Sequence, residues 1–167
     1  AVVAINAPQD KRIAELNAKL NTTYVAFGAK GKEAEKRQRV QDANAAKSGS
    51  LGSRIAAKAS AQYRNAGWDL VDALKEGKVK LEDVKDEDLP ETMRKMSVAE
   101  RKKHVEAQRA DRAKIQTEIR KLSKERKSYV AAERKKRGTA DNSLGAAMLK
   151  AVREQAAKQN FDLKGGK

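Results

Sequence analysis

The feature that most constrains this chain is its longest stretch without a helix breaker, since no glycine or proline occurs between residues 91 and 137. Within it, Ser97-Val98-Ala99-Glu100 has the form of a capping box, in which Ser97 and Glu100 bond each other's backbone amide. Gly138 suits the C-terminal end of a helix. We therefore predict one helix over about 98–137, roughly 60 Å long at 1.5 Å per residue.

The rest of the sequence is also typical of a mainly α protein, because it is rich in alanine and contains only two prolines. A short turn after Gly138 would let a last helix pack against the long one, so we expect an elongated helical hairpin or bundle. The N-terminal end differs. β-Formers at 1–5 and 22–28 flank a short helical pattern, which predicts a small strand–helix–strand remnant in which 22–28 is a second strand or an extended packing segment.

Changes in composition divide the chain into four parts. The predicted parts are a strand–helix–strand segment with a polar helix (1–47), a linker with the sequence SGSLGS (48–53), a helical segment with an acidic connector (54–96), and the long basic helix with a C-terminal helix and tail (97–167). Trp68 is the only tryptophan. We expect it to be a packing anchor for the acidic connector, and a partner-binding hot spot is the alternative.

The chain carries a net charge of +15, and residues 101–137 hold 15 basic against 5 acidic side chains. On a helical wheel, the apolar residues Ile115, Ile119, Leu122 and Tyr129 share one arc. A second arc is basic. The candidate binding residues on and after this arc are Lys102, Arg109, Arg120, Lys124, Lys127, Arg134, Lys135, Lys136 and Arg137. Such a row attracts polyanions or acidic proteins, but a merely solvated helix face has the same pattern.

The sequence contains no set of residues that indicates catalysis. Cysteine is absent, His104 is the only histidine, and there is no nucleophile motif or phosphate-binding loop. The acidic residues between 82 and 91 lack the spacing of a calcium loop. We therefore predict no enzyme activity, no cofactor and no metal site. No apolar run approaches the roughly 20 residues that a transmembrane helix needs.

Three segments carry a resemblance to a known family. They are INAPQDKRIAELNAKLNTTYVAFG, GKEAEKRQRVQDANA and YRNAGWDLVDALKEGKVKLEDVKDEDLPETMRKMS. Over roughly residues 2–152 the chain resembles the region that follows a von Willebrand factor type A domain in a bacterial family. The resemblance implies that residues 1–28 are the closing edge of such a domain and that the rest is its helical C-terminal extension. It further implies a longer parent protein and an envelope or extracellular location.

The metal-binding motif of that domain, D-x-S-x-S, is absent, so no metal ligand is carried over to this chain. Two hypotheses of function remain open. The first is a non-enzymatic helical interaction or assembly module with a protein partner, for which an acidic protein is one candidate. The alternative is a basic helical module that binds nucleic acid or another polyanion, whose affinity should fall steeply with salt.

Overall fold

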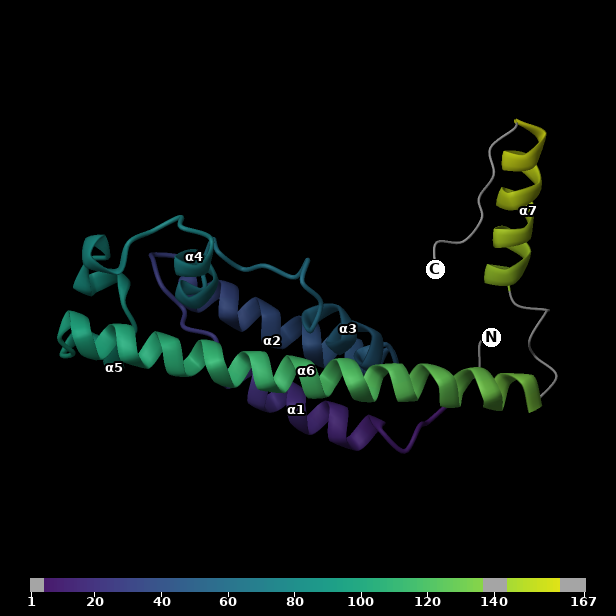
Figure 1. The fold of residues 1–167 in the computed structure, drawn as a ribbon, viewed down its shortest axis with the longest axis horizontal. Helices are drawn as coiled ribbons and strands as arrows, with labels where there is room; N and C mark the ends of the chain where they lie inside the picture. The colour runs from purple at the N-terminus through teal and green to yellow at the C-terminus, as the bar shows by residue number, and fades with distance from the viewer. Residues whose placement is uncertain (1–4, 137–143, 160–167) are drawn as a thin grey trace. The chain divides into compact units, whose positions relative to one another are not determined.

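The computed structural model describes residues 5–136 and 144–159, and this part of the chain is mainly helical, as predicted (Figure 1). It forms two compact units. The larger unit is Pro8–Arg126, and the smaller unit combines Ala1–Ala7 with Lys127–Lys167. The hairpin turn predicted after Gly138 falls in residues 137–143, which lie outside the described residues, as does Arg137.

The larger unit contains several helices, followed by a connector made of short helices. In chain order these are α1 (Asp10–Thr22), α2 (Gly31–Lys47), α3 (Leu51–Lys58), α4 (Leu70–Lys75), the 3-10 helices η1 (Leu81–Asp83) and η2 (Asp86–Asp88), and α5 (Glu91–Arg94). Helix α6 (Val98–Lys136) begins in this unit and continues without a break into the smaller one, which also contains α7 (Leu144–Lys158).

The long helix is confirmed from its predicted start to Lys136, the last described residue before the gap. Its capping box also forms. The Ser97 amide donates to Glu100 Oε2 at 2.8 Å, and the Glu100 amide donates to Ser97 Oγ at 3.3 Å. These bonds stabilise the ionised carboxylate, so the backbone and side-chain hydrogen bonds from Ser97 lower the pKa of Glu100.

Of the two alternatives for residues 22–28, the strand is wrong, and Tyr24 and Val25 pack in the core instead. Thr22 ends α1, and the residues after it form a single antiparallel bridge, between Ala26 and Asp69. The chain opposite Ala26 turns into α4 at Leu70, so the pairing cannot extend into a ladder. Of the other predicted strand, at 1–5, residues 1–4 lie outside the described residues.

The segment predicted as a linker over 48–53 is shorter in the structure, because α3 already begins at Leu51. Gly49 takes the left-handed conformation, with φ at 70°, and lets the chain reverse between α2 and α3. Ile55 of α3 is then fully buried, and Leu51 packs against the same core. Burial of this apolar face explains why the helix forms in a sequence rich in serine and glycine.

Two apolar clusters form the core of the larger unit. The first core cluster consists of Ile13, Leu16, Leu20, Tyr24, Ile55, Ala59 and Ile119. The second core cluster consists of Val25, Leu70, Val71, Leu81, Leu89, Met93 and Val105. Trp68 packs half-buried against the first cluster, with its ring 5.3 Å from that of Tyr24. The acidic connector docks elsewhere than predicted, since its residues Leu81, Leu89 and Met93 belong to the second cluster.

Candidate interaction surface on helix α6

Helix α6 faces the rest of the larger unit with arginine side chains as well as apolar ones. We call Arg101, Arg112 and Arg126 the inward arginines. At 100° per residue, all three fall within about 20° of the fully buried Ile119. They lie 7 or 18 residues from it, separations close to whole numbers of helical turns. That spacing is a signal in the sequence which a search for an apolar seam overlooks.

Arg112 uses all five of its N–H donors inside the protein. Nη1 donates to Asp69 Oδ2 at 2.6 Å and to Asp72 Oδ1 at 3.0 Å, and Nη2 donates to Asp69 Oδ1 at 3.1 Å. The remaining bonds go to the Thr23 carbonyl at 2.6 Å and hydroxyl at 3.1 Å. The guanidinium also lies 4.5 Å from the ring centroid of Tyr24, within the range of a cation–π contact.

The main partner of Arg112 is Asp69, whose side chain is 0% exposed. Asp69 precedes α4 and caps it, because Oδ2 accepts the amide of Asp72 at 3.1 Å. Its Oδ1 also accepts the amide of Val25 at 2.8 Å. One buried carboxylate therefore links α6, the start of α4 and the segment after α1. Its role is structural, since no part of it reaches solvent.

A second buried network surrounds Lys58, whose side chain is 0% exposed. Its ammonium donates to Asn17 Oδ1 at 2.7 Å, Asn21 Oδ1 at 2.7 Å and Asp42 Oδ2 at 2.8 Å, so all three protons are used. Burial alone would raise the pKa of Asp42, but hydrogen bonds from Lys58, the two asparagines and Arg54 outweigh it and lower that pKa to about 2. Burial lowers the pKa of Lys58.

The other two inward arginines hold α6 at different points along its length. Arg101 pairs with Asp86 at 2.6 Å and also donates to the carbonyl of Met93 at 3.1 Å. Arg126 pairs with Asp10, at the start of α1. Helix α6 is therefore attached to the connector and to α1 by charged side chains, in addition to the apolar contacts of Ile119 and Val105.

The predicted basic residues lie on a different face of α6. Lys102, Arg109, Arg120, Lys124, Lys127, Arg134, Lys135 and Lys136 are all exposed, and we call this set the basic stripe. Lys102 and Lys127 form no ion pair within the part of the chain that the structure describes. Arg109 approaches Glu106 at 3.6 Å, and Lys136 approaches Glu133 at 2.9 Å.

Arg120 differs from the rest of the stripe, because its guanidinium is engaged. Nη1 donates to the carbonyl of Ala59 at 3.0 Å, and Nη2 donates to Thr117 Oγ1 at 2.8 Å. The Ala59 carbonyl follows the last residue of α3, so Arg120 caps the C-terminal end of that helix. A test of binding should therefore leave Arg120 unchanged.

The described residues offer little else that is suited to chemistry. Among them, no group of three or more histidine, aspartate or glutamate side chains is arranged to hold a metal ion. The buried carboxylates are fully engaged by arginine, lysine and backbone donors. What remains accessible is charge on the outer face of α6.

No family model, curated protein or solved structure matches the chain. In the described part of the chain, none of the helices combines the length and the apolar character that crossing a membrane requires.

Proposed function

We propose that the chain is a non-enzymatic helical interaction module that binds an acidic protein partner through the basic stripe of α6. One observation carries this proposal: the cations of α6 that face the core have different surroundings from those that face outward. The inward arginines are neutralised by carboxylates, whereas the stripe cations are exposed. These exposed cations leave a positive potential on the outer face, and such a potential favours encounter with an acidic surface.

The geometry of the stripe also suits a partner. Lys102, Arg109 and Lys124 are exposed on the same side of one helix, over a length of about 33 Å at 1.5 Å per residue. Because the helix is fixed to the core by buried ion pairs, these side chains do not need to be ordered by folding when a partner arrives.

The test compares two charge-reversal variants that differ only in the face they change. The first carries Lys102→Glu, Arg109→Glu and Lys124→Glu. The matched control reverses Lys103, Lys114 and Lys121, three exposed lysines that lie about 60–140° further round α6 than the three residues of the first variant. The probe is labelled poly-glutamate at low salt, with binding measured by fluorescence anisotropy.

We expect the stripe variant to bind poly-glutamate at least about tenfold more weakly than the wild type, a loss of about 1.4 kcal/mol. The control, with the same net charge, should lose much less. Equal losses in both variants would mean that only net charge matters, and the proposal would fail. It would also fail if the wild type did not bind poly-glutamate.

Nucleic acid is a second candidate partner, favoured by the linear arrangement of the stripe. A row of cations along a straight helix matches a backbone of regularly spaced phosphates, and no aromatic residue of α6 lies on the stripe to stack on bases. For duplex DNA, the slope of log K against log salt should be about 3 smaller in magnitude in the stripe variant, because each phosphate contact contributes about 0.9. Binding of DNA without binding of poly-glutamate would favour this candidate over an acidic protein.

We also propose, on the resemblance alone, that the module follows a von Willebrand factor type A domain in a longer exported protein. The upstream coding sequence should then contain a D-x-S-x-S motif on a predicted strand, about 150–200 residues before Ala1, a typical domain length. An upstream sequence without it would remove this proposal. The binding proposal does not depend on it.

A further inference from the structure

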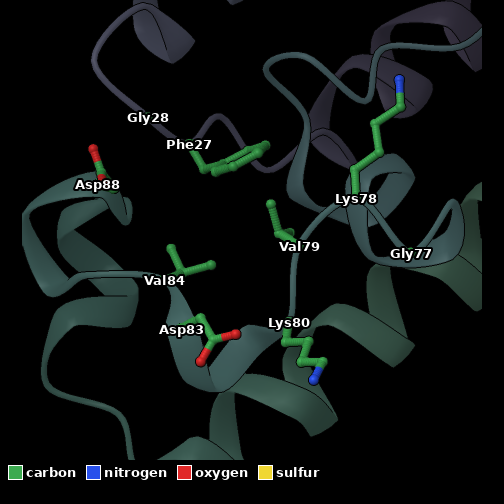
Figure 2. A pocket seen from close by; sticks show the side chains of 9 residues that line it. All are labelled: Phe27, Gly28, Gly77, Lys78, Val79, Lys80, Asp83, Val84 and Asp88. Carbon is green, nitrogen blue, oxygen red and sulfur yellow. The ribbon is translucent and has the colours of Figure 1, made fainter.

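The larger unit has a surface pocket that the basic stripe does not use. It has a volume of about 440 Å³ and lies between the segment after α1 and the chain from the end of α4 to η2. Phe27, Val79 and Val84 face one another across it (Figure 2). All three are half-buried and pack against the second core cluster. The pocket therefore has an apolar floor, part of which is left open to solvent.

Backbone hydrogen bonds hold the walls of this pocket in place. The amide of Gly28 donates to the Asp88 carbonyl at 2.8 Å, which joins the segment after α1 to η2. The Asp88 amide in turn donates to the carbonyl of Lys85 at 3.0 Å. On the other side, Gly77 has φ at 66° and lets the chain turn after α4 toward Val79. Because these bonds form within the larger unit, a ligand does not need to order the pocket when it binds.

The charges that remain at the pocket after internal pairing are mainly negative. Asp83 and Asp88 line it, and neither forms an ion pair among the described residues. Two lysines also line it, and one of them, Lys78, pairs with Glu76 at 3.2 Å. The side chains of Lys78 and Lys80 both point away from the apolar floor (Figure 2). The carboxylates beside the floor are therefore available to a cation from outside.

The segment that forms most of the pocket is acidic, although the chain as a whole is basic. Residues 76–91 contain seven carboxylates and three lysines, a balance of −4, so the rest of the chain carries +19 of the net charge of +15. The overall field of the protein repels a cationic ligand. A basic ligand that binds must therefore be recognised locally, by the carboxylates of this segment. An apolar side chain with cations next to it complements both the floor and its charge.

We propose that this pocket is a second interaction site, which binds a basic segment of a partner protein through one bulky apolar side chain. That side chain lies on the floor formed by Phe27, Val79 and Val84, and burial of the apolar surface stabilises the contact. Lysine or arginine residues next to it in the partner face Asp83 and Asp88, and these charges fix the orientation of the segment. The site prefers cations, the opposite of the basic stripe, and the proposal is independent of the stripe.

Two short peptides test the proposal on the whole chain. The probe is the fluorescently labelled peptide KKLKK, and its match is KKAKK, which keeps the charges and lacks the bulky side chain. Binding is measured by anisotropy at about 0.15 M salt, where a Debye length of about 8 Å screens distant cations more than carboxylates at the pocket. We expect the dissociation constant to be at least about tenfold lower for KKLKK than for KKAKK. This comparison uses the unchanged protein, so it does not depend on the folding of a variant.

Two charge-reversal variants show whether the carboxylates of the pocket are used. Asp83→Lys with Asp88→Lys should raise the dissociation constant of KKLKK at least about tenfold. The control is Asp111→Lys with Glu125→Lys, which makes the same change of net charge at exposed carboxylates of α6 outside the pocket. The control should raise the dissociation constant much less.

An NMR titration locates the bound peptide. Gly28 and Gly77 line the pocket, so their amide resonances should shift as KKLKK is added. Four results would overturn the proposal: no binding of KKLKK at about 1 mM, equal affinity for the two peptides, equal effects of the two variants, or binding that leaves both amides unshifted. None of them bears on binding of poly-glutamate by the basic stripe, so the two proposals can fail separately.

Discussion

Replacing Arg112 with methionine should remove a large part of the stability of the larger unit. Methionine keeps much of the aliphatic packing but none of the five N–H donors. Asp69, 0% exposed, would keep only the backbone amides of Val25 and Asp72 as donors, and the Thr23 carbonyl would lose its bond from Arg112. Removing one partner of a buried ion pair costs about 3–5 kcal/mol, because the other charge stays behind without compensation.

Urea unfolding is a suitable assay, because fluorescence of Trp68 reports on the affected core. The ring of Trp68 lies 5.3 Å from that of Tyr24, and the Arg112 guanidinium lies 4.5 Å from the ring centroid of Tyr24. The matched control is Arg109→Met on the exposed face of α6, where Arg109 only approaches Glu106 at 3.6 Å. A pair of that kind contributes at most about 1 kcal/mol. A domain of ordinary stability has only about 5–15 kcal/mol to lose, so the two variants should be easily distinguished.

A double-mutant cycle separates the ion pair from general damage to the core. Asp69→Asn removes the buried charge, so the variant with both Arg112→Met and Asp69→Asn should lose at least about 1 kcal/mol less than the sum of the single variants. The reasoning would be refuted if Arg112→Met cost no more than Arg109→Met. Strict additivity in the cycle would contradict it equally, since the two side chains would then not act on each other.

Three further predictions concern other parts of the structure. The pKa of Asp42 is lowered from 3.8 to about 2 in the folded chain, so its contribution to stability is complete above about pH 4 and is lost as the pH falls toward 2. In an acid titration, Asp42→Asn should therefore reduce the dependence of the unfolding free energy on pH over that interval. Gly77→Ala should destabilise the chain by about 1 kcal/mol in thermal unfolding, because Gly77 has φ at 66°, whereas Gly67→Ala, at a position with open space and no positive φ, should not. Ser97→Ala should cost about 1 kcal/mol by removing the cap of α6, and the lowering of the Glu100 pKa should become smaller in an NMR titration because one hydrogen bond to its carboxylate is lost.

The features that the sequence predicts correctly are those with local causes. Helix α6 follows from a long run without glycine or proline and from a capping box four residues long, and both act within a few residues of the chain. The same holds for the polar helix α2 before the glycine turn. At residues 22–28 local propensity left a strand and an extended packing segment open. The described residues form a single bridge there, and Tyr24 and Val25 are buried in the core.

The buried networks could not be predicted in the same way, because their partners are distant in sequence. Arg112 lies 43 residues from Asp69, and Lys58 lies 41 residues from Asn17. Within a helix that holds so many cations, Arg112 has the same local surroundings as the exposed Arg109. Only its position relative to Ile119 on the wheel separates the two, and that position becomes meaningful once Ile119 is known to be buried.

The inward arginines have a consequence for the alignment of α6 along its own axis. Leucine and isoleucine contacts can be exchanged for similar ones if a helix slides by one turn, about 5.4 Å. The bonds of Arg112 cannot, because a shift of that size would take the guanidinium out of reach of Asp69 and Thr23 together. The bonds of Arg112 therefore fix the axial register of α6. The apolar contacts of the helix alone would allow it to slide by one turn.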